Sequence, residues 1–353
     1  MSKTVTDFSG LLLEWFDQFG RHDLPWQKNI SPYRVWLSEI MLQQTRVSTV
    51  IPYFNQFIEH FPDIKSLASA SLDEVLHLWT GLGYYTRARN LHRTAILIDE
   101  QYSGRFPEDI NTLMSLPGIG RSTAGAILSL AFHQRHPIMD GNVKRVLCRY
   151  YKIEGWPGMS GVESELWKIA ERHTPNKRIA DYTQAIMDLG ATVCLRRNPV
   201  CEHCPLQQGC QAKRYCCQNS YPQKKPARKL PVRKTVFAIL ENHYGEILLE
   251  HRPPTGIWGG LWSFPECAPE NDIEQWIENE LGYVINSLEY RSGIRHTFSH
   301  FHLDIMPVHV KIVLNDGGSV CDSSRFCWYK PSNKQTLGMA TPVKKILNTV
   351  TQE

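Results

Sequence analysis

Four of the ten cysteines have a spacing that can hold a metal centre. They form the pattern C-x6-C-x2-C-x5-C and comprise Cys194, Cys201, Cys204 and Cys210. Four thiolates can bind either a [4Fe–4S] cluster or a single tetrahedral zinc ion. Structural zinc sites usually contain two close cysteine pairs, whereas this segment contains one close pair between two longer arms. The spacing therefore favours a cluster, with zinc as the alternative.

The segment Leu116-Pro-Gly-Ile-Gly120 can form an anion site between two segments with a helical pattern, 107–115 and 121–132. Gly118 and Gly120 permit a turn with positive φ and leave the backbone N–H groups unobstructed. Together with the N-terminus of the following helix, these amides can bind a DNA phosphate. The alternative is a tight turn between two helices with no ligand.

Glu39 is a carboxyl group within an otherwise almost wholly apolar helical segment, Val35-Trp-Leu-Ser-Glu-Ile-Met-Leu42. Desolvation in such a segment favours the neutral form of the carboxyl group, which can donate a proton. The alternative is that Glu39 belongs to a narrow polar stripe with Ser38 and Gln43.

Asp140 precedes Gly-Asn-Val-Lys-Arg-Val-Leu and stands where the N-cap of a helix is expected. A capping carboxylate that backbone amides hold ionised can also face a developing positive charge. The alternative is that Asp140 only caps its helix. Two carboxyl groups of different protonation state, such as Glu39 and Asp140, are what the hydrolysis of a glycosidic bond requires.

Four motifs precede the cysteine segment in order, and they carry a resemblance to a known family. They are Trp36-Leu-Ser-Glu-Ile-Met-Leu-Gln-Gln-Thr45, Gly81-Leu-Gly-Tyr-Tyr-Thr-Arg-Ala-Arg89, Leu116-Pro-Gly-Ile-Gly120 and Met139-Asp-Gly-Asn142. The hairpin and the cysteine spacing resemble those of the endonuclease III superfamily of DNA glycosylases. All motifs together resemble the adenine glycosylase (MutY) branch of that superfamily, over nearly the whole chain.

This resemblance implies a role for individual residues. Glu39 would protonate adenine and then assist water, while Asp140 would stabilise the sugar cation with support from Asn142. Residues in contact with DNA would be Gln44, Thr45, Tyr84, Gly118, Gly120 and Ser122, of which Gln44 and Tyr84 would enter the base stack. The adenine pocket would be lined by Trp26, Leu42 and Gln184. The resemblance also implies a [4Fe–4S] cluster on the four cysteines and double-stranded DNA with adenine opposite 8-oxoguanine or guanine.

The residue after the hairpin distinguishes branches of the superfamily. Bifunctional members, which also cleave the DNA strand, carry a catalytic lysine there. This chain reads Arg121-Ser122-Thr123. A serine hydroxyl cannot form the Schiff base that strand cleavage requires, so the sequence predicts a monofunctional glycosylase.

The C-terminal part contains a partial Nudix hydrolase signature. Gly260-x5-Glu266 is followed by a helical segment that ends Glu280-Leu-Gly-Tyr283, but most carboxylates of the signature are missing. Divalent cations need several oxygen ligands, so we expect a Nudix-type fold without hydrolase chemistry. The segment resembles the C-terminal lesion-recognition domain of adenine glycosylases. By that resemblance Phe298, Ser299 and His300, in a turn-like segment 295–300, would read the lesion; simple packing of these side chains is the alternative.

The pattern along the chain indicates two domains that position these residues. Short helices separated by proline and glycine continue to residue 220, and Ser71-Leu-Asp-Glu74 is a capping box. Strand-like runs follow at 234–241, 246–250 and 302–313, with a helical stretch at 272–281. The sequence thus predicts an all-α helix–hairpin–helix glycosylase domain (1–220, hairpin 107–132, iron–sulfur loop 194–210), a linker (221–233) and an α+β Nudix-like domain (234–353).

Composition adds weak constraints on partners and location. Residues 1–225 carry a net charge of +5 and residues 226–353 a net charge of −1. A mildly basic first domain suits DNA but equally suits an ordinary surface. The N-terminus lacks an apolar signal core, and no apolar run reaches the about 18 residues of a membrane span. We expect a monomer in the cytoplasm, associated with the nucleoid through DNA, with no membrane partner.

Three other functions are compatible with parts of the sequence. A bifunctional glycosylase/lyase for oxidised bases would carry a lysine near residue 122 and lack the second domain. A Nudix-type nucleotide hydrolase would need a complete signature. A non-catalytic or redox-responsive lesion-binding protein would leave the settings of Glu39 and Asp140 as coincidences.

Overall fold

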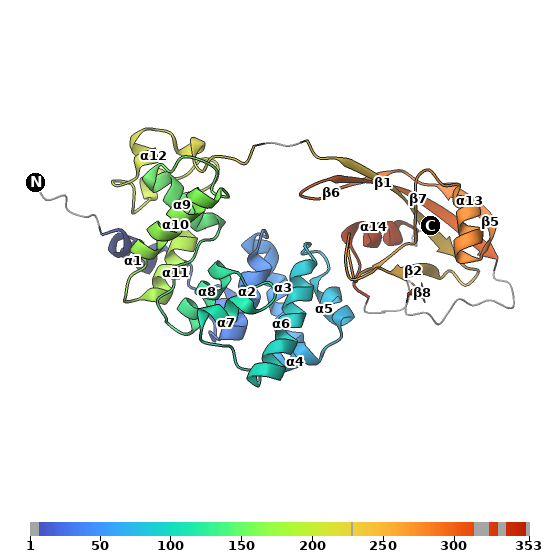
Figure 1. Ribbon diagram of the computed structural model, residues 1–353, viewed down its shortest axis with the longest axis horizontal. Helices are drawn as coiled ribbons and strands as arrows, with labels where there is room; N and C mark the ends of the chain where they lie inside the picture. Colours follow the sequence, from blue (N-terminus) through green and yellow to red (C-terminus); the bar gives the residue numbers. More distant parts are fainter. Residues whose placement is uncertain (1–6, 227–228, 314–324, 331–336, 351–353) are drawn as a thin grey trace, which may run out of the picture. The chain divides into compact units, whose positions relative to one another are not determined.

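The computed structural model describes residues 7–226, 229–313, 325–330 and 337–350. Contacts between Cα atoms divide the chain into two units (Figure 1). The helical unit comprises Met1–Ser69 and Asn90–Ala227, and the sheet unit comprises Ala70–Arg89 and Arg228–Glu353. Residues 70–89 therefore group with the C-terminal residues and not with the helices that flank them in the sequence.

The helical unit consists of short helices. They are α1 (Phe8–Phe19), α2 (Pro32–Leu42), α3 (Val47–His60), α4 (Ile64–Ser69), most of α6 (Thr86–Tyr102), α7 (Ile110–Ser115), α8 (Arg121–Ala131), α9 (Gly141–Tyr151), α10 (Ser160–His173), α11 (Ile179–Asp188) and α12 (Gln211–Arg214). A π-helical turn, Leu189–Val193, continues α11, and 3-10 turns lie at Pro25–Gln27, Cys201–His203 and Gln218–Ser220. The predicted all-α domain is confirmed.

Side-chain caps fix the beginnings of α2 and α7. Ser31 accepts a hydrogen bond from the backbone N–H of Arg34 and so begins α2, with Pro32 in its first turn. Asp109 caps α7 in the same way, which starts that helix at Ile110. The helix therefore begins three residues later than the predicted segment 107–115, because the side chain of Asp109 sets the boundary.

Apolar packing holds these helices in place. Leu12, Leu147, Leu166 and Ile186, from α1, α9, α10 and α11, are fully buried in one cluster. Burial of such a side chain contributes about 1.5–3 kcal/mol. Trp36, Leu37 and Met41 of α2 are also fully buried, and α2 packs against α8. The helix that carries Glu39 is thus anchored on its apolar side.

The sheet unit begins with α5 (Leu72–Trp79) and contains a mixed eight-stranded sheet. Its strands are β1 (Val232–Glu241), β2 (Ile247–His251), β3 (Trp262–Ser263), β4 (Glu266–Cys267), β5 (Val284–Tyr290), β6 (Ile294–Thr297), β7 (His302–Val313) and β8 (Phe326–Tyr329). Its other helices are α13 (Ile273–Trp276), which a π-helical turn at Ile277–Leu281 extends, and α14 (Thr341–Val350). The predicted α+β domain is confirmed.

Strands β1 and β7 form the centre of the sheet. They pair in parallel from Val232 opposite His302 to Glu241 opposite Lys311. The strands of the main path of the sheet follow the order β3-β2-β1-β7-β5. Both faces of β1 are buried between Phe237 and Leu240, since α13 packs on the Ala238 face and Phe264 lies beside Phe237 on the other. This explains why the second half of β1, residues 236–240, is a continuous apolar run instead of an alternating one.

The segment 70–89 packs on the sheet unit through polar contacts to its backbone. Ser71 and Glu74 form the predicted capping box of α5, which is confirmed. The Tyr85 hydroxyl donates to the carbonyl of Met339 at 3.1 Å, and Arg89 Nη1 donates to the carbonyl of Gly259 at 2.6 Å. These bonds fix the loop that carries Tyr84 within the sheet unit.

Several elements of the sheet unit differ from the sequence-based expectation. The segment 295–300 was expected to be a turn, but Arg295–Thr297 belongs to β6 and pairs with β7. Only the following residues form the turn, which the bond from Phe298 N–H to the Phe301 carbonyl closes at 2.9 Å. The short strands and α14 were not predicted. Within the described part of the chain, none of the helices has both the length and the hydropathy needed to cross a membrane.

Candidate active site

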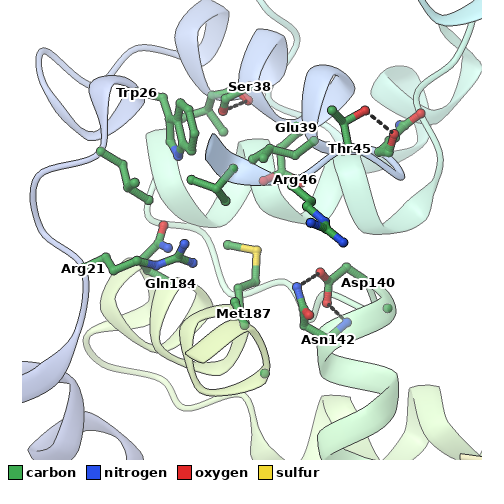
Figure 2. A pocket seen from close by; sticks show the side chains of 18 of the residues that line it. Arg21, Trp26, Ser38, Glu39, Thr45, Arg46, Asp140, Asn142, Gln184 and Met187 are labelled. Atoms are coloured by element: carbon green, nitrogen blue, oxygen red, sulfur yellow. Dashed lines mark hydrogen bonds between the residues drawn. The ribbon is translucent and has the colours of Figure 1, made fainter. Parts of the chain in front are cut away.

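A single cavity of the helical unit gathers nine of the predicted site residues (Figure 2). Its volume is about 760 Å³, within the range of about 300–1,000 Å³ that is usual for ligand sites. The nine residues are Trp26, Glu39, Leu42, Gln44, Thr45, Ser122, Asp140, Asn142 and Gln184. We call this the carboxylate cavity. Tyr84, Gly118 and Gly120 do not line it.

Glu39 lies in the last turn of α2, on the side that faces the carboxylate cavity (Figure 2). Burial raises the pKa of its carboxyl group to about 8, and the nearby charge of Asp140 adds to this shift. Ser38 is buried and donates to the carbonyl of Val35 at 2.8 Å, so it forms no solvent-facing stripe with Glu39. Glu39 therefore holds a proton at neutral pH, as its apolar segment predicted.

Asp140 is the N-cap of α9, as its position in the sequence predicted. Its Oδ1 accepts from the backbone N–H groups of Asn142 at 2.9 Å and Val143 at 2.7 Å, and its Oδ2 accepts from Asn142 Nδ2 at 2.9 Å. Burial raises the pKa of Asp140, while these hydrogen bonds and the charge of Arg145 oppose that rise. The sequence predicted the stabilising amides but not the opposing desolvation.

Asn142 is held by a residue that the sequence reasoning missed. Arg145 Nη2 donates to Asn142 Oδ1 at 2.8 Å, which directs the Asn142 amide nitrogen toward Asp140. Arg145 Nε also donates to the carbonyl of Cys194 at 2.6 Å. The spacing of Asn142 and Arg145 by three residues on a helix is the signal that could have indicated this pair.

Ser122 has a structural contact that was also not predicted. Its hydroxyl oxygen accepts from the backbone N–H of Met139 at 2.9 Å. Because Met139 directly precedes Asp140, Ser122 fixes the chain at the point where the second carboxylate begins. Ser122 thus helps to fix the position of Asp140 through this hydrogen bond.

Of the two hairpin glycines, only Gly118 has the positive φ that the sequence indicated; Gly120 has a φ of −88°, which other residues also adopt. Gly118 has a φ of 78°, where a side chain would be strained and would also meet Asn90 at 3.0 Å. Gly120 is the N-cap of α8 and has no heavy atom within 4 Å of an added Cβ. Its surroundings leave room for a ligand at the helix N-terminus.

Tyr84 lies on a loop of the sheet unit and is not among the residues that line the carboxylate cavity. Gly83 and Tyr84 both have positive φ, at 70° and 51°, and the Tyr84 side chain is 51% exposed. Arg87 Nη2 donates to the carbonyls of Leu82 and Gly83, each at 3.2 Å, and its guanidinium lies 5.6 Å from the Tyr84 ring centroid. These contacts stiffen the loop and present an exposed ring.

A second pocket, of about 600 Å³, lies in the sheet unit and joins Tyr84 to Phe298, Ser299 and His300. We call it the aromatic pocket. The Phe298 ring stacks on Phe301 with centroids 4.5 Å apart and lies 5.5 Å from the ring of Trp258. Ser299 and His300 are exposed. Phe298 is therefore partly a packing residue, while Ser299 and His300 face outward. The sequence analysis did not predict that Trp258 belongs to this pocket.

The four cysteines of the predicted metal centre line one small cavity, together with Arg149, Lys213 and Gln218. Arg149 Nη1 donates to Cys194 Sγ at 3.3 Å and Gln218 Nε2 to Cys201 Sγ at 3.6 Å. Donors to sulfur stabilise the charge of a thiolate-bound cluster. Among the described residues, no three Cys, His, Asp or Glu converge closely enough to share one metal ion. The lining of this cavity thus combines four sulfur ligands with side chains that donate hydrogen bonds to two of them.

Glu266 of the partial Nudix signature and Glu250 of the neighbouring β2 are engaged in ion pairs. Glu266 is paired with Arg252, and Glu250 accepts from Arg325 Nη2 at 2.8 Å. Guanidinium groups thus neutralise carboxylates at this end of the sheet. This pairing supports the expectation that the hydrolase chemistry of the fold is lost.

Comparison with known proteins agrees with both domains. The HhH-GPD superfamily of base excision DNA repair proteins matches residues 37–172, and the NUDIX domain family matches residues 235–349. The solved structure of a thermostable thymine-DNA glycosylase has a TM-score of 0.54 and 27% identity, and covers 59% of this chain and 96% of its own.

Full-length relatives extend this agreement. The adenine DNA glycosylase of Buchnera aphidicola subsp. Acyrthosiphon pisum is 42% identical over 96% of this chain and 96% of its own length. The human adenine DNA glycosylase is 36% identical over 85% of this chain and 66% of its own. The resemblance seen in the sequence motifs is confirmed: the chain is a DNA glycosylase and belongs to the adenine DNA glycosylase family.

Proposed function

We propose that this enzyme hydrolyses the N-glycosidic bond of adenine that is mispaired with 8-oxoguanine or guanine in double-stranded DNA. The observation that carries the proposal is that Glu39 and Asp140 face one cavity and have distinct hydrogen-bond surroundings. Glu39 is desolvated, whereas three N–H groups bind Asp140. This difference supplies both a proton donor and an anion.

The chemistry follows from these two side chains. Adenine would leave the base stack and enter the carboxylate cavity, where the Glu39 carboxyl group would give its proton to the departing base. Asp140 would stabilise the positive charge that develops on the sugar. Glu39, now ionised, would then accept a proton from the water that attacks the sugar.

The enzyme would be monofunctional. Strand cleavage through a Schiff base needs an amine near the sugar, and none of the described residues that line the carboxylate cavity is a lysine. The nearest lysine in the sequence to Asp140, Lys144, donates to Glu163 at 2.9 Å. The product would therefore be an abasic site in an intact strand.

Recognition of the opposite base would belong to the aromatic pocket. A ring that stacks and two exposed side chains that form hydrogen bonds are suited to an unpaired or altered base. Phe298, Ser299 and His300 provide these groups, and Tyr84 lies in the same pocket. Gln44, with a φ of 59°, would enter the base stack from the turn after α2, next to Thr45.

The DNA backbone would be bound by the hairpin at Gly118 and Gly120, because the N-terminal amides of α8 form an anion site. Cys194, Cys201, Cys204 and Cys210 would hold a [4Fe–4S] cluster, which supplies a rigid cross-link for this loop when bound. The enzyme would act as a monomer on nucleoid DNA in the cytoplasm.

The test is a single-turnover assay on duplexes with one labelled strand. We expect excision of adenine opposite 8-oxoguanine and guanine, and strand breakage only after alkali or heat. Borohydride trapping of a stoichiometric covalent adduct, at the rate of excision, would contradict the monofunctional assignment. No excision of adenine opposite either base would contradict the proposal as a whole.

The cluster is tested separately by metal analysis of anaerobically purified protein. We expect about four irons per chain and a yellow-brown colour. Stoichiometric zinc without visible absorption would overturn this assignment.

A further inference from the structure

We propose that Asp188 and Arg21 fix the orientation of the Gln184 side chain, so that its carbonyl oxygen faces the carboxylate cavity and selects adenine by its exocyclic amine. This inference rests on the proposed function, in which adenine enters that cavity. Asp188 and Arg21 would be positioning residues that act through Gln184.

Asp188 is a buried carboxylate at the C-terminal end of α11, one helical turn after Gln184. Its Oδ2 accepts from the backbone N–H of Arg21 at 2.7 Å. Its Oδ1 accepts from Arg21 Nε at 3.0 Å, Arg21 Nη2 at 2.5 Å and Gln184 Nε2 at 2.8 Å. The carboxylate group is thus surrounded by four N–H donors.

Helix stability alone does not account for an aspartate at this place. A buried charge must be paired to be tolerated. Arg21 provides the pairing, but an apolar residue would avoid the cost of desolvating the charge. The observed arrangement is therefore better explained by what Asp188 does to Gln184.

An ionised carboxylate only accepts hydrogen bonds, so it determines which end of a neighbouring amide faces it. The amide nitrogen of Gln184 must point to Asp188, because the opposite orientation would place two acceptor oxygens in contact. The carbonyl oxygen of Gln184 is then directed away from Asp188. Gln184 and Trp26 both line the carboxylate cavity (Figure 2).

The other end of this arrangement is fixed to the turn that carries Trp26. The carbonyl of Arg21 accepts from Gln27 Nε2 at 2.8 Å, and Gln27 Oε1 accepts from the backbone N–H of Leu24 at 3.0 Å. Trp26 packs edge-on against Phe54 at a centroid distance of 5.5 Å. The position of the Arg21 backbone is therefore also fixed by Gln27, independently of Asp188.

A carbonyl oxygen in this position distinguishes purines by the group at C6. Adenine carries an amino group there, which can donate to Gln184 Oε1. Hypoxanthine and guanine carry a carbonyl group, which would face the oxygen of Gln184 without a hydrogen. Polar groups that are left unpaired in a closed site give strong rejection of the wrong base.

The test compares single-turnover excision of adenine and of hypoxanthine, each opposite 8-oxoguanine. Asp188→Asn replaces the carboxylate by an amide that can donate or accept a hydrogen bond. The side-chain amide of Gln184 can then adopt either orientation. We expect the ratio of the two rates to fall at least about tenfold. Gln184→Ala should lower the ratio similarly, and Asp188→Asn should have no further effect on the ratio in the Gln184→Ala background.

A charge-conserving double variant tests for restoration. When Asp188→Asn is combined with Gln184→Glu, the new amide at position 188 can donate a hydrogen bond. Both oxygens of the new carboxylate at position 184 are acceptors. The cavity then faces an acceptor in either orientation of that side chain, so the ratio should recover. A ratio that stays low in the double variant would contradict the proposal.

Two further outcomes decide the matter. If Asp188→Asn slows excision of both bases in parallel, Asp188 has a structural role only and the inference is wrong. If Asp188→Asn does not fold, Arg21→Lys is measured in the same way, and an unchanged ratio overturns the inference. Failure of the wild-type protein to excise adenine would instead contradict the proposed function.

Discussion

The two pockets of this glycosylase differ in how their side chains are held. In the carboxylate cavity, Asp140 accepts three hydrogen bonds, and Gln184 is only 8% exposed. In the aromatic pocket, Ser299 and His300 are exposed, and their side chains form a hydrogen bond with each other at 3.3 Å. Asp140 and Gln184 are thus held by hydrogen bonds to their own helices, while Ser299 and His300 face solvent.

This difference corresponds to two physical tasks. Bond cleavage needs groups whose protonation and position are set before the substrate arrives, and burial sets both. Inspection of a base in DNA needs rings and donors that can reach the duplex, which a buried site would prevent. We therefore expect substitutions in the carboxylate cavity to change rates, and those in the aromatic pocket to change selectivity.

The largest effect is expected for Glu39→Gln. Glutamine has nearly the same shape but cannot deliver a proton, so excision should fall by about 10²–10⁴-fold while DNA binding is retained. Single-turnover excision and equilibrium binding to an uncleaved duplex measure the two properties. The matched control is Glu14→Gln, since Glu14 is exposed on α1. Joint loss of binding and folding would show Glu39 to be structural.

Asp140→Asn should have the next largest effect. Asparagine caps helices about as well as aspartate, so the melting temperature should change little while excision falls by about 10²–10³-fold. Asp140→Ala should lose the cap as well, at a cost of about 0.5–2 kcal/mol. Thermal melts of both variants, alongside excision assays, separate the charge from the cap. Similar activity of wild type and Asp140→Asn would contradict the role of the charge.

The pH dependence of excision should reflect Glu39. Because the pKa of Glu39 is raised to about 8, its acid form predominates below that pH and is lost above it. The rate should therefore fall about tenfold per pH unit on the alkaline side. The pKa of Asp140 is also raised, so the rate should fall at acid pH as its carboxylate is protonated. Glu39→Gln should lack the alkaline limb; an alkaline limb that persists there would belong to another group.

A smaller effect is expected in the aromatic pocket. Phe298→Ala removes a half-buried ring, and stacking of a base on an aromatic ring contributes about 1–3 kcal/mol. The ratio of the rates of adenine excision opposite 8-oxoguanine and opposite guanine should fall about tenfold. The rate opposite guanine, the slower of the two, should change little. Tyr290→Ala is the control, because Tyr290 is an exposed aromatic residue of the same unit. Excision is compared at fixed salt, since phosphate contacts are salt-dependent. An unchanged preference would place lesion reading elsewhere.

For two candidate residues of the helical unit, the local setting could be predicted from the sequence alone. The apolar segment around Glu39 indicated its raised pKa, and the position of Asp140 before a helical run indicated its cap. Both signals extend over fewer than ten residues. The cavity that joins these residues follows from helix packing and could be inferred only from the family resemblance.

Contacts between distant segments could not be predicted. Arg21 and Asp188 are separated by 167 residues, and neither lies in a motif that we recognised. The short strands of the sheet unit, such as β3 and β4, have only two residues each and no periodicity to detect. Nor does any local signal show that residues 70–89 group with the C-terminal residues.

The smallest effect is expected for Ser122→Ala, within the carboxylate cavity itself. The substitution removes the oxygen that accepts from the Met139 N–H, and an unsatisfied buried N–H costs about 1–3 kcal/mol. Because Asp140 follows Met139, we expect excision to slow only a few-fold, together with a lower melting temperature. Ser122→Thr retains the hydroxyl oxygen and should behave like the wild type in both measurements. If Ser122→Ala slows excision without a change in melting temperature, Ser122 contacts the DNA instead of supporting Asp140.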